Sequence, residues 1–451
     1  MMQNFTLSKL RNFWLVSLTA TALLLLATPM FTKAQQAIGT DNLLVLVAAT
    51  NNNNTTVSVV EINKTTANQS PIQTIEIPGT GSNAVRVSGS ATTTLYAGNS
   101  NDGTLFCFTG HLSDNTGVNA NTILPRVVLT INNAGTVTYA ATYSGTSGQQ
   151  TRCATTLDNT NFYIADQGGH YTNNATAPSP TGNYRAIRAF GGTVYVGSQS
   201  PTAGLNEVRV MTALTGGEAQ AIPGIGNNNT FQDFYFVSSG SNGNTFDVLY
   251  ILRSTSATAG TIEKYSLVGG TWTSNGTYTT DFGGFSLAAE KSGNGARLYV
   301  TSGAGATTAN RVIRLTDANG YNAALNITTA DNVVLFTAAT GTILKGLGFA
   351  PRPTVPAGIS NLLAERGISI MPNPVDKNQP LHIRFNNSMA ARYEVSVYSI
   401  NGSRVGSQVI QHPGGSGMQR MELPANLTPG IYVVEFVDNK GQRGSTRLVI
   451  Q

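Results

Sequence analysis

The sequence predicts an all-β protein in which a six-bladed β-propeller, with seven blades as the alternative, is followed by a small immunoglobulin-like β-sandwich. Three observations support this prediction. Between residues 40 and 350, short apolar runs alternate with turns rich in Asn, Gly, Ser and Thr, and helical periodicity is almost absent. Within that region one strand phrase recurs at the spacing of a propeller blade. From residue 368 onward the strands become longer and alternate more regularly.

The predicted organisation has four parts: a signal peptide (1–34), the propeller (35–350), a Pro-rich linker (351–367) and the sandwich (368–451). A basic start precedes an apolar stretch, and small residues at positions −3 and −1 predict cleavage between Ala34 and Gln35. No later segment approaches the roughly 18 consecutive apolar residues of a membrane helix. We therefore expect a secreted or surface-anchored protein with no transmembrane segment after signal removal.

The composition excludes one class of partner. Charged residues make up 11% of the chain, whereas about 25% is usual. Loss of Lys9, Arg11 and Lys33 with the signal peptide leaves 24 of the 27 basic residues against 22 acidic ones. A nearly neutral surface without a Lys/Arg stripe argues against nucleic-acid binding.

A recurring strand phrase, a short apolar strand motif centred on a tyrosine, supports the propeller. Its first and last copies are 203 residues apart, and this distance divides into four repeat intervals. The repeat of about 51 residues fits one four-stranded blade and is too short for a stack of β-sandwiches. We expect these tyrosines to pack between blades rather than to form a sugar-stacking platform. The copies are centred on Tyr96, Tyr163, Tyr195, Tyr250 and Tyr299.

A second phrase marks the passage from one blade to the next. Ile77–Gly81 recurs as Ile222–Gly226, and each copy ends one apolar strand and introduces another. Proline ends the pairing because it has no N–H to donate, and glycine lets the chain swing to the next inner strand. Two further junctions are expected at residues 281–284 and 340–342.

The two ends of the propeller region are expected to pair with each other. Leu344–Ala350 has the pattern of an inner strand with no blade after it, whereas Leu43–Val47 and Val57–Ile62 resemble middle strands with no inner strand before them. Pairing them would close the ring and remove the exposed sheet edges. Thr136–Tyr143 is an additional predicted strand, and because of it a propeller of seven blades remains the alternative.

Four ordered motifs mark the C-terminal part: Met371–Pro374, Val397–Gly402, Leu427–Tyr432 and Arg447–Ile450. Asn401-Gly402 also predicts a hairpin with a type I′ turn, in which both residues have positive φ. Together the motifs resemble the type A sorting domain of type IX secretion cargo, over roughly the last fifth of the chain. The matching residues are Pro372, Asn373, Pro374, Asn401, Gly402, Gly430, Ile431, Tyr432, Arg447, Leu448 and Val449.

This resemblance implies export from a Gram-negative cell. The partners it implies are the outer-membrane type IX secretion machinery and its sorting protease, and the passenger would be released or attached at the outer cell surface. Met371 and Ser399 depart from the family, where an aromatic residue and Asp are common. An ordinary accessory immunoglobulin-like domain is the alternative.

The propeller region offers few candidates for chemistry. Asp166 follows a strand phrase and Asp233 follows a junction, so both are weak candidates for a ligand-contacting face. His111 and His170 lie in turn-rich stretches without a second ligand at metal spacing, and we expect solvated loop histidines. Gly79–Ala84 matches G-x-G-x-x-A, but a strand rather than a helix follows, which argues against a dinucleotide site. No catalytic, metal or cofactor residue is predicted, and no cofactor.

Cys107 and Cys153 lie in predicted strands, and an oxidising exterior permits a disulfide between them. Two buried free thiols are the alternative, because cysteines on strands of different sheets seldom meet at disulfide geometry.

Three functions fit these observations. The first is a non-catalytic module that binds an extracellular glycan or protein. The second is a secreted enzyme that degrades glycans or peptides with carboxylates in the propeller channel. The third is a structural component of a surface layer. Low charge and the lack of a nucleophile–base pair in the sequence favour the first.

Overall fold

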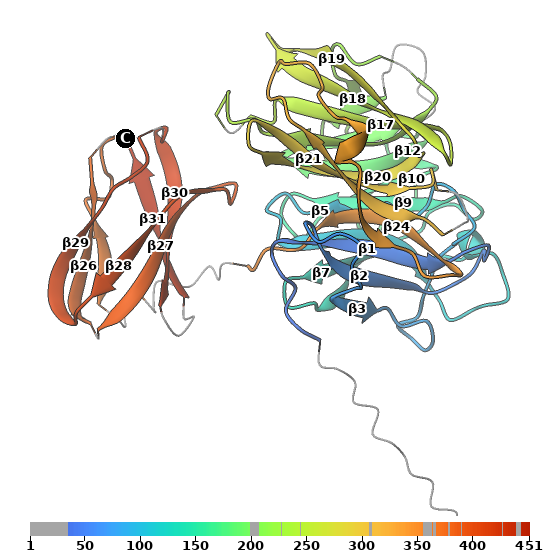
Figure 1. Cartoon of the computed structure of the whole chain (residues 1–451). Helices are drawn as coiled ribbons and strands as arrows, with labels where there is room; N and C mark the ends of the chain where they lie inside the picture. Colours follow the sequence, from blue (N-terminus) through green and yellow to red (C-terminus); the bar gives the residue numbers. More distant parts are fainter. Residues whose placement is uncertain are drawn as a thin grey trace, which may run out of the picture. The chain divides into compact units, whose positions relative to one another are not determined.

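The computed structural model describes residues 35–451 except 199–206, 227, 244, 306–308, 355–362, 364–366, 378, 389, 426 and 439–442 (Figure 1). The predicted signal peptide, with Ala34 before its cleavage site, lies outside the described residues, as does most of the predicted linker. In the described part of the chain, no helix is long and apolar enough to span a membrane.

The described residues are all-β, and those between 42 and 349, the passenger, form six antiparallel sheets. The first two sheets, each in pairing order, are β24 (Thr342–Phe349), β1 (Asn42–Ala49), β2 (Val57–Asn63) and β3 (Gln73–Glu76); and β4 (Val85–Arg86), β6 (Leu105–Leu112), β7 (Arg126–Asn132) and β8 (Val137–Tyr143), with β5 (Gly98–Asn99) also paired to β6. The third is β9 (Thr151–Thr156), β10 (Phe162–Asp166) and β11 (Gly169–Tyr171).

The other three passenger sheets follow the chain order without a crossover. They are β12 (Tyr184–Phe190), β13 (Thr193–Ser198), β14 (Val208–Met211) and β15 (Ala219–Ala221); β16 (Phe231–Val237), β17 (Val248–Ser256), β18 (Ala259–Val268) and β19 (Thr271–Thr280); and β20 (Gly284–Ser292), β21 (Gly295–Ser302), β22 (Arg311–Asp317) and β23 (Val333–Thr337). Two short 3₁₀ turns, η1 (Ala120–Thr122) and η2 (Thr329–Asp331), interrupt the loops.

One strand of each passenger sheet, which we call its inner strand, packs against the inner strands of neighbouring sheets. The circuit of contacts runs from β24 to β5, β9, β12, β16 and β20, and back to β24. It closes because β24 pairs with β1, from Leu43 opposite Phe349 to Ala49 opposite Thr342. The predicted pairing of the two ends is therefore confirmed. The spare strand Thr136–Tyr143 lies at the outer edge of the second sheet, as β8.

The junction phrases lie where the sequence predicts them. Ile77–Gly81 connects β3 to β4, and Ile222–Gly226 connects β15 to β16. The tyrosines of the strand phrase serve the core, because four of the five are buried and Tyr195 packs against the same apolar cluster as Tyr96 and Tyr163.

Two glycines let the inner strands approach closely. A Cβ atom on Gly98 would lie 2.6 Å from the carbonyl oxygen of Ala154 on β9, and one on Gly346 would lie 2.5 Å from the backbone nitrogen of Ala97. Since no side chain fits there, the inner strands meet through their backbones at this level.

Residues 368–451 form two further sheets with a core of their own. The sheets are β25 (Ile368–Met371), β26 (Leu381–Ser388) and β29 (Gly415–Met421); and β28 (Arg404–His412), β27 (Ala391–Ser399), β30 (Gly430–Asp438) and β31 (Arg443–Ile450). Their apolar side chains, such as Phe385 from the first sheet and Val395 and Val434 from the second, gather in one cluster. All buried members of this cluster lie between Leu363 and Ile450.

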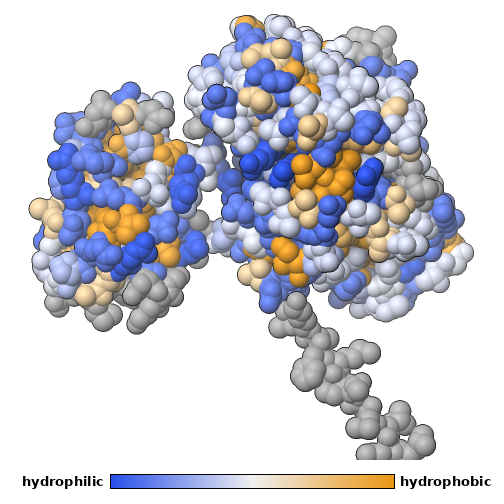
Figure 2. All heavy atoms as spheres, viewed as in Figure 1, coloured by the Kyte–Doolittle hydropathy of each residue, from blue (hydrophilic) through white to orange (hydrophobic). Residues whose placement is uncertain are grey.

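The surface of the passenger reflects its composition. On the face that Figure 2 shows, weakly polar residues (pale) cover wide areas and apolar residues (orange) form separate patches. A surface built from hydroxyls and amides needs few charges for solubility, which agrees with the low charged content of 11%.

Candidate functional site

The passenger has a group of buried polar, cationic and aromatic side chains near the start of its six inner strands. Each inner strand contributes one buried side chain there, which for β5 comes from two residues before the strand. Three of these side chains are cationic and none is acidic. The set, which we call the inner-strand cluster, is Tyr96, Arg152, Arg185, Gln232, Phe285 and Lys345.

β-Bulges direct five of these side chains. Arg152, Gln232 and Phe285 are each the extra residue at a register shift against the next strand of their sheet. In β12 and β24 the shift spans Arg185 and Lys345 together with the residue that follows each. A bulge takes a side chain out of the alternation of its strand, so the cluster residues can face one another while their neighbours serve the core.

Four members interlock through polar and aromatic contacts. Arg185 Nη1 donates to Gln232 Oε1 at 2.7 Å and to the Tyr96 hydroxyl at 3.3 Å. The Tyr96 ring stacks on Phe285, with centroids 4.4 Å apart. Burial raises the pKa of Tyr96, so this hydroxyl is neutral at physiological pH.

Lys345 is a fully buried ammonium without a carboxylate partner among the described residues. Its Nζ lies 2.9 Å from the carbonyl oxygen of Ala91 and 3.2 Å from that of Gly305. The same atom is 5.2 Å from the centroid of the Phe285 ring, in cation–π geometry. Burial lowers the pKa of Lys345 to about 7.

Arg152 is held in a similar way by neutral oxygens. Its Nη1 donates to Asn183 Oδ1 at 2.6 Å and to the Tyr184 carbonyl at 2.9 Å, and its Nη2 donates to Thr93 Oγ1 at 3.3 Å. Burial, with a smaller effect of the neighbouring Arg185 charge, lowers the pKa of Arg152 to about 10. The 88–95 segment is thus tied down twice, by Arg152 at Thr93 and by Lys345 at Ala91.

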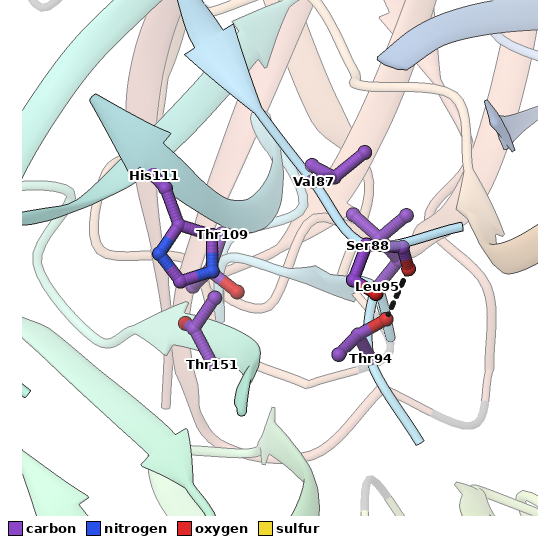
Figure 3. Close-up of a pocket in the computed structure, with 7 residues that line it drawn as sticks. All are labelled: Val87, Ser88, Thr94, Leu95, Thr109, His111 and Thr151. Carbon is purple, nitrogen blue, oxygen red and sulfur yellow. Dashed lines mark hydrogen bonds between the residues drawn. The ribbon is translucent and has the colours of Figure 1, made fainter. Parts of the chain in front are cut away.

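A small pocket lies under the same segment (Figure 3). His111, Thr109 and Thr151 lie on one side of it and the 88–95 segment on the other, where Thr94 Oγ1 donates to the Ser88 carbonyl at 3.1 Å. Its interior has room for about one water molecule. Thr109 Oγ1 is buried there without a hydrogen-bond partner in the described part of the chain. The lining residues are Val87, Ser88, Thr94, Leu95, Thr109, His111 and Thr151.

Protonation of His111 is expected to destabilise the passenger in acid. Burial, with a smaller effect of the Arg126 charge, lowers the pKa of His111 from 6.5 to about 4. The unfolded chain therefore binds this proton more tightly, so the stability due to neutral His111 is complete above pH 6.5 and is lost as the pH falls toward 4. Between pH 7.5 and 4.5 the loss is on the order of 2–3 kcal/mol.

Urea unfolding of wild type and His111→Gln at the two pH values measures this effect. The difference in unfolding free energy between the two proteins should depend on pH, because only wild type titrates there. A difference that stays constant from pH 7.5 to 4.5 would contradict the prediction.

The two carboxylates predicted as ligand-face candidates are buried instead. Asp166 on β10 pairs with Arg126 on β7 and accepts a hydrogen bond from the Tyr143 hydroxyl at 2.9 Å. Asp233 on β16 lies 2.6 Å from Nη2 of Arg188 on β12. Each carboxylate therefore joins two neighbouring sheets. Three further pairs join passenger sheets in the same way: Arg253–Glu207, Lys264–Asp317 and Lys64–Glu290.

The prediction of solvated loop histidines is wrong. His111 lies on β6 and His170 on β11, and both are buried. Each Nδ1 contacts a backbone carbonyl, of Ile123 at 3.0 Å and of Ser179 at 2.8 Å. Within the described residues, no three His, Cys, Asp or Glu side chains gather in a way that could hold a metal ion.

The two cysteines are free and buried, so the candidate disulfide is not formed. Cys107 packs in a cluster with Ala154, whereas Cys153, one residue before Ala154, faces the cluster that contains Tyr96. Because side chains alternate along a strand, Cys153 and Ala154 point to opposite faces of β9. Cys107, on β6, packs on the Ala154 side, so the Cys153 thiol points away from it.

The predicted sorting motifs meet in the C-terminal unit. Asn373, between Pro372 and Pro374, donates from Nδ2 to the Arg447 carbonyl at 2.6 Å and accepts from the Val449 N–H at 2.9 Å. The first motif therefore holds β31, the strand that carries Arg447, Leu448 and Val449. Gly430, Ile431 and Tyr432 begin β30, which pairs with β31 along its whole length.

The hairpin at Asn401-Gly402 forms, but its turn differs from the prediction. Gly402 has φ +79°, whereas Asn401 is not among the residues with positive φ. A type I′ turn needs both. The connection from β27 to β28 instead spans four residues, and the Ser403 N–H donates to Asn401 Oδ1 at 3.2 Å.

Sequence reasoning missed the inner-strand cluster. The one signal that could have found it is the alignment of the inner strands, in which Arg152, Arg185, Gln232, Phe285 and Lys345 each follow the first strand residue or lie close to it. Alternation alone gives no reason to expect them at one place, because the bulges that turn them are not visible in the hydropathy pattern.

Similarity to known proteins is informative at the C-terminus. No curated protein matches the chain. Among solved structures, a putative 6-phosphogluconolactonase from Bacteroides uniformis has 13% identity and a TM-score of 0.38, covering 88% of this chain and 100% of that one. A second, from Bacteroides fragilis, has 12% identity and a TM-score of 0.34, covering 85% and 98%. PorZ, a surface component of the type IX secretion system of Porphyromonas gingivalis, has 11% identity and a TM-score of 0.18, covering 90% and 81%.

TM-scores this low do not establish a shared fold, so nothing is transferred from these structures. Residues 369–451, in contrast, match the secretion system C-terminal sorting domain. This domain implies interaction with the type IX machinery. The chain therefore carries a type IX sorting domain and is exported to the cell surface or the extracellular space.

Proposed function

We propose that the passenger is a six-bladed β-propeller and that residues 368–451 fold as an immunoglobulin-like sandwich. The six successive sheets, the closed circuit of inner strands and the β24–β1 pairing support the propeller. The two facing sheets support the sandwich, as does the bond from the Tyr432 hydroxyl to the Thr428 carbonyl at 2.8 Å, which resembles a tyrosine corner.

The passenger acts as a non-catalytic binding module for an extracellular glycan or protein. The type IX machinery exports it by means of the sorting domain, and the sorting protease cuts in the 351–367 linker. Proline lacks the N–H that a sheet ladder needs, so a proline-rich stretch is a natural boundary between two folded units and a natural place for the cut.

The proposal of a non-catalytic role rests on the burial and ion pairing of the two candidate carboxylates. Glycoside hydrolysis needs two carboxyl groups that face a common space, yet Asp166 and Asp233 are each locked to an arginine inside the protein. Their charges are neutralised and their oxygens are occupied, so neither can act on a substrate without breaking a link between sheets. The unpaired Nε atoms of Arg152 and Arg185 on the inner strands are hydrogen-bond donors, which suit binding.

The mature chain, residues 35–451, is expected to bind a subset of immobilised glycans or proteins and leave them chemically unchanged. Array binding followed by mass spectrometry of each recovered ligand measures both properties. Residues 368–451 alone serve as the control, since binding by that part would move the activity away from the passenger. Shortened products from a recovered ligand would favour the enzyme alternative and reject this proposal.

A further inference from the structure

We propose that the inner-strand cluster binds an oxyanion, a carboxylate or a phosphate group, between Arg152, Arg185 and Lys345. This inference rests on the proposed binding function for the identity of the molecule that carries the group. It assigns the chemistry of recognition to named residues of the passenger.

The first argument is uncompensated charge. The exposed fractions of Arg152, Arg185 and Lys345 are 3%, 5% and 0%. None of the three has a carboxylate within ion-pair distance among the described residues, whereas Arg126, Arg188, Arg253 and Lys264 each have one. Burying an unpaired charge costs several kcal/mol, and Arg152 and Arg185, on the neighbouring strands β9 and β12, repel each other. A bound anion removes both costs.

The second argument is the supply of unused donors. The Nε atoms of Arg152 and Arg185 are buried and have no hydrogen-bond partner in the described part of the chain. Lys345 Nζ has three N–H groups when protonated, and the described residues offer it two acceptor oxygens. The Gln232 side-chain oxygen, an acceptor within the cluster, already accepts from Arg185. Donors in excess of acceptors are what an oxyanion satisfies.

The third argument concerns size. The cluster residues are nearly closed to solvent, and the backbones meet directly beside them at Gly98 and Gly346. Only a small group, such as a single carboxylate or phosphate, can reach side chains that are this closed to solvent, so the rest of the ligand stays outside.

Buried arginines elsewhere do not share these features. Arg86 is also buried without a carboxylate, but it lies apart from other cations and bonds Asn54 Oδ1 at 2.6 Å and the Asn54 carbonyl at 2.9 Å. It is a matched control for the loss of a buried guanidinium.

Thermal unfolding and calorimetric titration of the mature chain test the proposal. The probes are inorganic phosphate and glucuronate, with sodium chloride added to keep the ionic strength constant and glucose as the neutral control. We expect phosphate or glucuronate to raise the Tm and to bind with one-to-one stoichiometry, because a ligand that binds only the folded state stabilises it. The tighter of the two identifies the group as phosphate or sugar carboxylate.

Arg185→Met should weaken binding of that probe at least tenfold, and Arg86→Met should leave its Kd within twofold of wild type. Lys345→Met removes one cation of the site and leaves the carbonyl oxygens of Ala91 and Gly305 without their donor, so its Tm without anion should fall and its response to anion should disappear. Arg86→Met should also lower the Tm but keep the response to anion, which separates a lost site from a destabilised variant.

Two results would overturn the proposal: no response of wild type to either probe, or an equal response of wild type, Arg185→Met and Lys345→Met. Binding of a neutral glycan or a protein that Arg185→Met leaves intact would also overturn the anion site, while the binding function proposed above would stand.

Discussion

Replacement of Asp233 by alanine is expected to lower the free energy of unfolding of the mature chain by about 3–5 kcal/mol. Arg188 would be left buried with an unpaired charge. Three further donors would lose this acceptor, because the Ser286 hydroxyl, the Leu287 N–H and the Phe234 N–H contact the carboxylate at 3.0, 2.8 and 2.8 Å. Asp233 therefore joins three successive inner strands, β12, β16 and β20, and its loss affects all of them.

Urea unfolding followed by circular dichroism measures this change, with Asp114→Ala, at an exposed loop position, as the control. Replacement of both partners, Asp233→Ala with Arg188→Met, should cost less than the sum of the single changes, because no lone charge remains. Strictly additive losses, or a loss below 1 kcal/mol in Asp233→Ala, would show that the pair is not a structural link.

Most of the architecture of the passenger can be predicted from local patterns of turn residues and strands in the sequence. Ile77–Gly81 and Ile222–Gly226 combine a ladder-ending proline with flexible glycines, and such turn chemistry acts within a few residues. The pairing of β24 with β1 followed from an unpaired inner strand at one end and unpaired middle strands at the other. The turn at Asn401-Gly402 was predicted in place but not in type, since the loop length depends on the register of β27 and β28.

The candidate site was much less predictable. Asp166, Asp233 and His111 were placed in loops or on a ligand face, yet all three are buried. Their burial depends on partners that are 40 to 45 positions away in the case of the two Asp–Arg pairs. Strand alternation does not reveal which distant arginine will neutralise a carboxylate. The same limit hides the inner-strand cluster, where bulges decide the direction of Arg185 and Lys345.

Deletion of residues 368–451 is expected to abolish export and to hold the passenger in the periplasm. These residues contain the whole sorting-domain match, 369–451. Folding should be unaffected, because the passenger clusters contain only residues from Ile38 to Ala350 and the C-terminal cluster contains none of them. Cell fractionation with an antibody to the passenger, together with protease resistance of the retained protein, separates failed export from failed folding.

A single substitution sharpens the same test. Asn373 holds β31 through two backbone hydrogen bonds, to the Arg447 carbonyl and from the Val449 N–H. Asn373→Ala should therefore reduce the exported fraction by loosening the terminal strand, whereas Asn386→Ala, at an exposed position of β26, should not. If the deleted chain still reached the cell surface as efficiently as wild type, the export signal would have to lie in the passenger. If the deleted chain failed to reach the surface but Asn373→Ala was exported normally, the machinery would recognise parts of the sorting domain other than β31.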